Sequence, residues 1–206
     1  AILSEVEAER RLQQILQGLQ WPEIEVVSIK ISTVYSQISP LAREHTVAVL
    51  CDRLERLFRT ADRARFTRPD GTEVPKFVYL DMEEYRDKEL TAAAFMRTLD
   101  RPGLEHVRAG IALQSYIPDS HRTLLQLQEW ARQRVAAGGG RITIRLVKGA
   151  NMESERAESS MRGWPQAPYR SKLETDANYK RMVHALLQPD NLAAMDVGIA
   201  SHNLFD

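Results

Sequence analysis

Five short apolar strand patterns, separated by helical patterns, constrain the fold of this chain more than any other feature. The predicted strands cover residues 26–32, 77–81, 110–116, 142–147 and 196–201. Alternation of apolar and polar residues is clearest in the first and the fourth, as expected of a strand with one buried face. Segments with apolar residues at helical spacing precede the first strand and separate each strand from the next. Such regular alternation indicates a parallel α/β sheet with right-handed crossovers.

Local signals mark several boundaries of the predicted helices. Ser4, followed three residues later by Glu7, resembles a capping box. Pro40 stands at the first helical position of the next helix. The turn signature Pro69-Asp70-Gly71 marks a polar loop before the second strand. Helices are expected from residue 4 to about 19, from 39 to about 61, after Thr91, from a cap at Asp119-Ser120 to about 135, and over about 152–161 and 176–187.

The strand ends favour a barrel over a doubly wound sheet. No G-x-G-x-x-G follows a strand, and Lys148-Gly149 lacks the glycine spacing of a P-loop. Instead, each predicted strand has a polar or ionisable side chain at or near its carboxyl end: Lys30, Asp81, Gln114, Arg145 and His202. In an eight-stranded α/β barrel, residues at these ends build the active site. The sequence therefore predicts a partial (β/α)8 barrel with about five parallel strands.

Composition and charge exclude several other classes. The chain has 206 residues, enough for one domain, and it carries 28 basic and 28 acidic residues. No basic stripe points to nucleic acid. Cys51 is the only cysteine, so a disulfide framework or a cysteine zinc site is excluded, and we expect it in the core. No segment resembles a membrane span or a signal peptide. We expect residues 1–206 to be one partial domain, truncated at both ends.

Residues 141–151 concentrate the groups best suited to a ligand. Arg145 lies on the less apolar face of its strand, three residues before Lys148. Burying an arginine there costs free energy unless something anionic or electron-rich meets it. Arg145 offers a fork of donors, Lys148 a point charge, and Gly149 allows close approach of the backbone. The alternative is an ordinary solvated arginine on an edge strand with a surface lysine.

Five segments of the chain together carry a resemblance to a known family: Val27–Ser32, Leu80–Glu84, Ile111–Gln114, Ile144–Ala150 and Ala200–Asn203. They resemble proline dehydrogenase, the FAD-dependent barrel that begins proline catabolism. They occur in order, cover nearly the whole chain and are similar to the second through sixth strands of that barrel. The stretch from Asp176 onward is similar to the bifunctional bacterial branch, proline utilization A. A parent of that type would also carry glutamate-semialdehyde dehydrogenase activity.

The resemblance implies an oxidation of L-proline to 1-pyrroline-5-carboxylate by hydride transfer to flavin N5. It makes Asp81 and Arg145 catalytic and places Lys30 at the proline carboxylate, with no metal. A fixed guanidinium beside the flavin stabilises the negative charge that develops there. Asp81 could be a charge partner of Arg145 or Lys30, or could help the substrate amine lose its proton. The implied FAD-binding residues are Met82, Gln114, Arg145, Val147, Lys148, Gly149, Ala150, Ser201 and His202.

Two departures from the family pattern affect what we expect of this chain. Asn151-Met152 stands where many relatives have aromatic residues, and no Tyr-x-x-Arg-Arg helix follows His202 to hold the substrate carboxylate. We therefore expect the chain to be inactive alone and to associate through open strand edges. For the parent protein we expect a quinone or another electron acceptor. Its expected location is cytoplasmic, with peripheral membrane association as a further option.

Three alternatives stay open on the sequence. A Schiff-base lyase barrel could use Lys30 or Lys148 as its nucleophile. A metal-dependent barrel could use Asp81, Glu83 and His202, although their spacing forms no compact ligand motif. The third alternative is a non-catalytic barrel fragment that folds only by forming oligomers.

Overall fold

A single parallel sheet forms the centre of the molecule. The computed structural model describes residues 4–149, 157, 159–161, 163 and 166–200. The sheet has five strands in the order β1-β4-β5-β6-β7, which is also their order along the chain. A doubly wound sheet reverses its strand order at a switch point, whereas the wall of a barrel does not. The predicted strands and the partial barrel are confirmed. The strands are β1 Val26–Lys30, β4 Phe77–Asp81, β5 Gly110–Gln114, β6 Ile142–Val147 and β7 Met195–Ala200.

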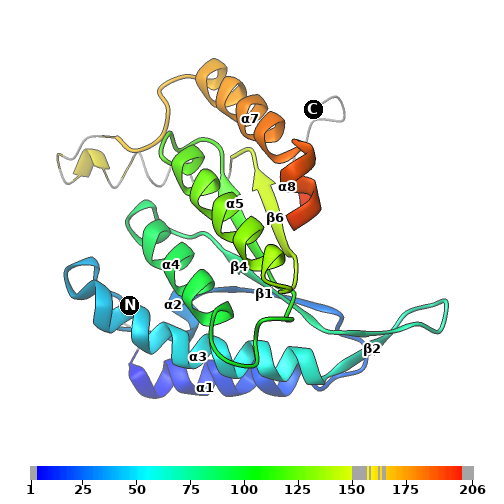
Figure 1. The fold of residues 1–206 in the computed structure, drawn as a ribbon. Coiled ribbons are helices and arrows are strands. Elements are labelled where there is room, and N and C mark those ends of the chain that lie inside the picture. Colours follow the sequence, from blue (N-terminus) through cyan, green and yellow to red (C-terminus); the bar gives the residue numbers. More distant parts are fainter. Residues whose placement is uncertain (1–3, 150–156, 158, 162, 164–165, 201–206) are drawn as a thin grey trace.

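Helices lie around the outside of the curved sheet (Figure 1). The alternation within β6 shows the two faces: Ile142, Ile144 and Leu146 are buried, whereas the residues between them are only partly buried. The first set packs among the helices, and the second set faces the interior of the partial barrel. The helices are α1 Glu5–Gly18, α2 Ile31–Val34, α3 Arg43–Arg63, α4 Lys88–Leu99, α5 Ser120–Ala136, α7 Lys172–Leu186 and α8 Pro189–Ala194, with 3-10 turns η1 Pro40–Ala42 and η2 Tyr85–Asp87.

The helix boundaries follow the local signals in most places. The Ser4 side chain accepts a hydrogen bond from the Glu7 backbone N–H at 3.2 Å, as predicted for the start of α1. The α7 helix begins four residues before its predicted start because Ser171 and Glu174 form a capping box. Most of the helix expected over 152–161 lies outside the described residues. Cys51 is buried in α3, as predicted, with its pKa raised by burial.

Asp119 is an exception among the predicted caps. It occupies the N-cap position of α5, but its side chain makes no capping hydrogen bond. It instead accepts a hydrogen bond from the Tyr85 hydroxyl at 2.6 Å. The prediction was wrong about the hydrogen bond because Tyr85, in the 3-10 turn η2, competes for the carboxylate.

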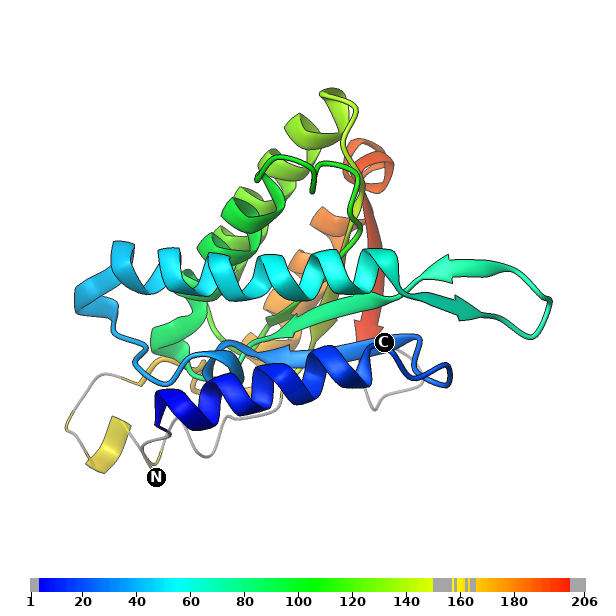
Figure 2. The same ribbon diagram turned by 90° about the horizontal axis from the view of Figure 1, so that it is seen from below.

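A β-hairpin replaces part of the loop expected before β4. Strands β2 Arg65–Thr67 and β3 Glu73–Pro75 pair antiparallel and project from the body of the molecule (Figure 2). Each strand has only three residues, too few for a periodic pattern to be recognised. The predicted turn is present at the tip, where Gly71 has a φ of 84° that favours glycine. Within the described residues, no helix is long and apolar enough to cross a membrane.

Candidate functional site

An ion pair at the carboxyl ends of β4 and β6 is the centre of the candidate site. The Arg145 guanidinium donates a hydrogen bond to Asp81 Oδ1 from two strands away. The sheet register places Ala112 of β5 opposite Arg145. Its methyl group leaves room for the guanidinium to cross the intervening strand. The sequence therefore places both a long side chain and the small neighbour that it needs.

Asp81 is engaged through both carboxylate oxygens. Its Oδ2 accepts a hydrogen bond of 2.6 Å from the hydroxyl of Ser28 on β1. The Arg145 and Asp81 side chains are 32% and 27% exposed, so water screens the pair less than a surface pair. Of the two charge partners left open by the sequence, the structure selects Arg145.

Tyr79 lies beside this pair on the same face of β4. The Arg145 guanidinium carbon is 5.0 Å from the centre of the Tyr79 ring, a cation–π distance. Burial raises the pKa of the Tyr79 phenol, while the Arg145 charge and a hydrogen bond with Thr143 act in the opposite direction. Arg145 is thus met by a carboxylate and by the face of an aromatic ring.

Lys30 lies apart from the Asp81–Arg145 pair. Its ammonium is 3.5 Å from Glu83 Oε1, and the Ser32 hydroxyl donates to the other oxygen of Glu83. The Lys30 side chain is 47% exposed, as expected at the edge of a sheet. A cation held this loosely remains accessible to a ligand carboxylate.

Lys148 is directed toward the helices. It lies two residues after Leu146, so its side chain is on the same side of the sheet as that of Leu146. Its ammonium lies 3.2 Å from Asp176 Oδ1 on α7 and 5.3 Å from the centre of the Tyr179 ring. Lys172 shares the same carboxylate at 3.2 Å. Burial acts to raise the pKa of Asp176, but the two lysines outweigh it and lower that pKa. The structure thus joins the end of β6 to the start of α7.

The other residues expected to contact a cofactor differ in exposure. Gln114 is 4% exposed, and its side-chain oxygen has no hydrogen-bond partner among the described residues. Met82 is buried, Val147 is half-buried and Gly149 is exposed. The last three predicted residues lie outside the described part of the chain: Ala150, Ser201 and His202.

Several residues around the site were missed in the sequence. Ser28 and Tyr79 each lie two residues before a predicted site residue, so strand parity places them on the same face. That signal could have identified both. Asp176 and Tyr179 carry no comparable signal because only the packing of α7 brings them to Lys148.

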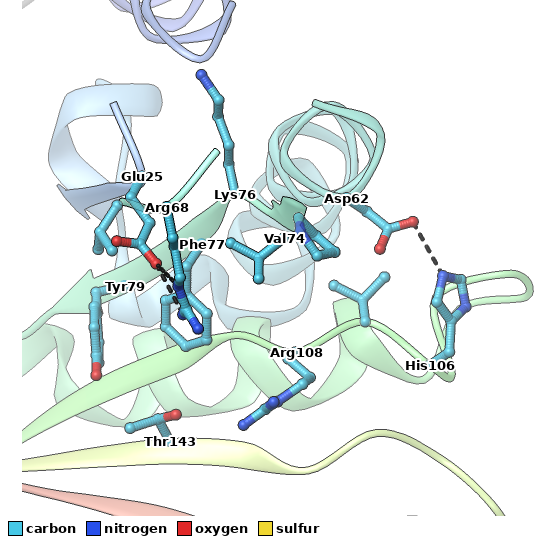
Figure 3. Close-up of a pocket in the computed structure, with 13 residues that line it drawn as sticks. Glu25, Asp62, Arg68, Val74, Lys76, Phe77, Tyr79, His106, Arg108 and Thr143 are labelled. Carbon is cyan, nitrogen blue, oxygen red and sulfur yellow. Dashed lines mark hydrogen bonds and ion pairs between the residues drawn. The ribbon is translucent and has the colours of Figure 1, made fainter. Parts of the chain in front are cut away.

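A separate cavity of about 410 Å³ lies toward the amino ends of the strands (Figure 3). Its charged side chains meet partners from the protein itself: Glu25 pairs with Arg68 at 2.9 Å, and Asp62 lies 3.0 Å from His106. It shares Tyr79 with the ion pair at the strand ends. Because the acidic side chains that line it, Glu25 and Asp62, are paired within the protein, we place the candidate site at the carboxyl ends.

Comparisons with known proteins identify one family. The family model described as proline dehydrogenase matches residues 1–206. A proline dehydrogenase of Deinococcus radiodurans is 30% identical over 127 residues, which cover 62% of this chain and 33% of that protein.

Solved structures give the same result. Proline utilization A (PutA) from Corynebacterium freiburgense is 41% identical with a TM-score of 0.89, over 100% of this chain and 20% of that one. PutA from Bdellovibrio bacteriovorus, solved after inactivation by N-propargylglycine, is 32% identical with a TM-score of 0.83, over 98% of this chain and 22% of that one. The chain therefore spans about a third of this curated relative and a fifth of these structures.

Proposed function

Because this chain belongs to the proline dehydrogenase family, we propose that it forms part of the barrel of an enzyme that oxidises L-proline to 1-pyrroline-5-carboxylate with FAD. One observation carries the proposal. Asp81 and Tyr79 fix the Arg145 guanidinium at the strand ends, where barrel enzymes build their sites. A preorganised cation in a partly dry site stabilises negative charge as it develops on an acceptor.

The residues present fit a flavin. The buried side-chain oxygen of Gln114 has no donor among the described residues, and an orphaned buried acceptor costs free energy until a donor meets it. The N–H edge of a flavin ring is such a donor. We assign Met82 and Val147 to the surroundings of the ring. Lys148, Gly149 and Ala150, with Ser201 and His202, would hold the rest of the cofactor. When bound, FAD supplies the acceptor for the hydride that leaves proline.

We assign Asp81 to the orientation of Arg145. Both of its oxygens already accept hydrogen bonds, one from Arg145 and one from Ser28. Lys30 would bind the proline carboxylate, because its 3.5 Å contact with Glu83 is loose and its side chain is half-exposed. Lys30 and Lys148 each form an ion pair with a carboxylate of the protein, Lys30 with Glu83 and Lys148 with Asp176. That environment disfavours the Schiff-base alternative.

We further propose that the parent protein is of the proline utilization A type. The 41% identity to the Corynebacterium protein across the full chain supports this proposal. Such a parent would pass electrons to a quinone or another acceptor. The strands β1 and β7 lie at the edges of the sheet, so the isolated chain would associate through them.

The test is a proline-dependent dye-reduction assay on two proteins. One is this chain, and the other is extended at both ends to the length of its relatives. We expect the extended protein to bind oxidised flavin, seen in its visible spectrum, and to reduce the dye. The 206-residue chain should turn over far more slowly and form dimers or larger species by light scattering. The proposed function would be disproved if the extended protein bound no flavin, or if proline did not reduce the flavin that it bound.

A further inference from the structure

The Tyr79 ring occupies the space that a side chain at position 110 would need. Tyr79 and Gly110 are register partners on β4 and β5. A Cβ atom added to Gly110 would lie 2.2 Å from Cε1 and 2.3 Å from Cδ1 of Tyr79, and 2.9 Å from the Phe77 ring. Real side chains do not approach so closely. Gly110 is therefore required by the ring that lies over it.

Other contacts hold the ring in this place. The Phe77 ring lies 4.9 Å from it, centre to centre, at an interplanar angle of 57°. The phenol forms a hydrogen bond with Thr143, which lies two residues before Arg145 on β6. The ring is thus buttressed from β4, β5 and β6, and its face lies 5.0 Å from the Arg145 guanidinium carbon.

We propose that Tyr79, seated on Gly110, is a positioning residue that sets the plane of the Arg145 guanidinium. The Asp81 hydrogen bond fixes the direction in which the arginine side chain extends. It leaves rotation about that direction open, and stacking on the ring removes this freedom. The plane then determines where the remaining N–H donors point. The proposal rests on the proposed function in one respect only: that function identifies the negative charge with which these donors interact.

Substitutions made in the protein extended to the length of its relatives separate the ring from the hydroxyl. Tyr79→Leu and Tyr79→Met remove the ring, Tyr79→Phe keeps it, and Gly110→Ala displaces it without changing Tyr79. We expect Tyr79→Leu, Tyr79→Met and Gly110→Ala to lower kcat by about ten- to a hundredfold with little change in KM. A small misplacement of a catalytic group has effects of this size. Tyr79→Phe should stay within about threefold of the unsubstituted protein, since it keeps the ring face.

A second measurement needs neither flavin nor proline. Phenylglyoxal modifies accessible guanidinium groups, and peptide mass spectrometry reports each arginine separately. In apo-protein, Arg145 should react several-fold faster in Tyr79→Leu, Tyr79→Met and Gly110→Ala than in the unsubstituted protein or Tyr79→Phe. Arg141, on the same strand and paired with Asp196, is the internal control and should not change.

The two measurements distinguish failure of the proposed function from failure of the positioning role. If proline does not reduce the flavin of the unsubstituted protein, the proposed function is wrong, while the labelling still tests the positioning of Arg145. If Arg145 reacts equally fast in folded Tyr79→Leu, Tyr79→Met and unsubstituted apo-protein, the positioning role is refuted. A Gly110→Ala protein that does not fold would leave this comparison unaffected, because both ring-removing variants keep the glycine.

Discussion

Arg145 of β6 reaches Asp81 of β4 across Ala112, the residue of β5 that lies opposite it in the sheet. On its other side, the register partner of Arg145 is Gly198 of β7. Small residues on both neighbouring strands leave space around a long cationic side chain. A larger side chain at position 112 would compete with the guanidinium for the same volume, whereas a Cβ added to Gly198 would only contact Cγ of Arg145 at 3.5 Å. The small residue on β5 thus suits the path of the arginine toward Asp81.

Replacement of Arg145 by alanine should slow flavin reduction by proline far more than replacement of Arg141. Loss of one preorganised donor to developing charge raises the barrier by about 3 kcal/mol, roughly a hundredfold in rate. Arg141 instead donates to Asp196 and to the carbonyls of Leu192 and Met195, so its loss should mainly lower stability. Stopped-flow absorbance measures the reduction rate, and thermal unfolding measures the stability. Equal reduction rates for the two variants would remove the role assigned to Arg145.

Ser28→Ala should weaken the support of Asp81. It removes the 2.6 Å hydrogen bond to Oδ2 but leaves the Arg145 contact in place. A hydrogen bond of this kind contributes about 1 kcal/mol, so we expect flavin reduction about fivefold slower. Ser28→Thr keeps the hydroxyl and should restore most of the rate. The idea fails if the alanine variant matches the unsubstituted protein, or if threonine gives no recovery.

Lys148→Ala should weaken FAD retention more than it slows reduction in the molecules that keep flavin. The ammonium lies beside Asp176 and Tyr179, on the side of the sheet opposite to Arg145. Titration of apo-protein with FAD measures the affinity, and single-turnover reduction measures the rate. Lys180→Ala, an exposed charge on the same helix as Asp176, is the matched control. Normal FAD affinity with slow reduction would contradict the assignment.

Lys88→Met should increase the free energy of unfolding near pH 7. Lys88 is 2% exposed, and its ammonium has no hydrogen-bond partner among the described residues. Its nearest aromatic contact is the Tyr85 ring at 5.6 Å, and Asp119 and Glu89 attract it only at longer range. An unsatisfied buried group of this kind typically costs about 1–3 kcal/mol. Methionine fills similar space without the charge.

The effect of Lys88→Met should depend on pH with a defined sign. Burial lowers the pKa of Lys88 below its ordinary value of 10.5, so the unfolded chain binds more protons between the two values. The original protein therefore gains stability as pH rises from the lowered pKa toward 10.5, and the advantage of the variant shrinks there. Urea unfolding at several pH values measures this difference. An advantage that grows with pH would contradict the burial of a charged Lys88.

The sequence by itself determined the five strands of the parallel sheet and the residues at their ends. Those features are local, because a period of two or of 3.6 residues can be recognised without any partner. The five segments that resemble proline dehydrogenase also lie in single short stretches. The pairing of Arg145 with Asp81 was among the expected outcomes, since the carboxyl ends of parallel strands meet at one edge of a sheet.

Tertiary structure alone decided which partner each charge meets. Asp81 pairs with Arg145 and not with Lys30 because Ala112 lets the guanidinium cross β5. Lys148 meets Asp176 because α7 packs against the end of β6. Asp119 bonds to Tyr85 instead of capping its own helix. Each of these contacts joins residues that are far apart in the chain, so it depends on strand register and helix packing, which no local pattern encodes.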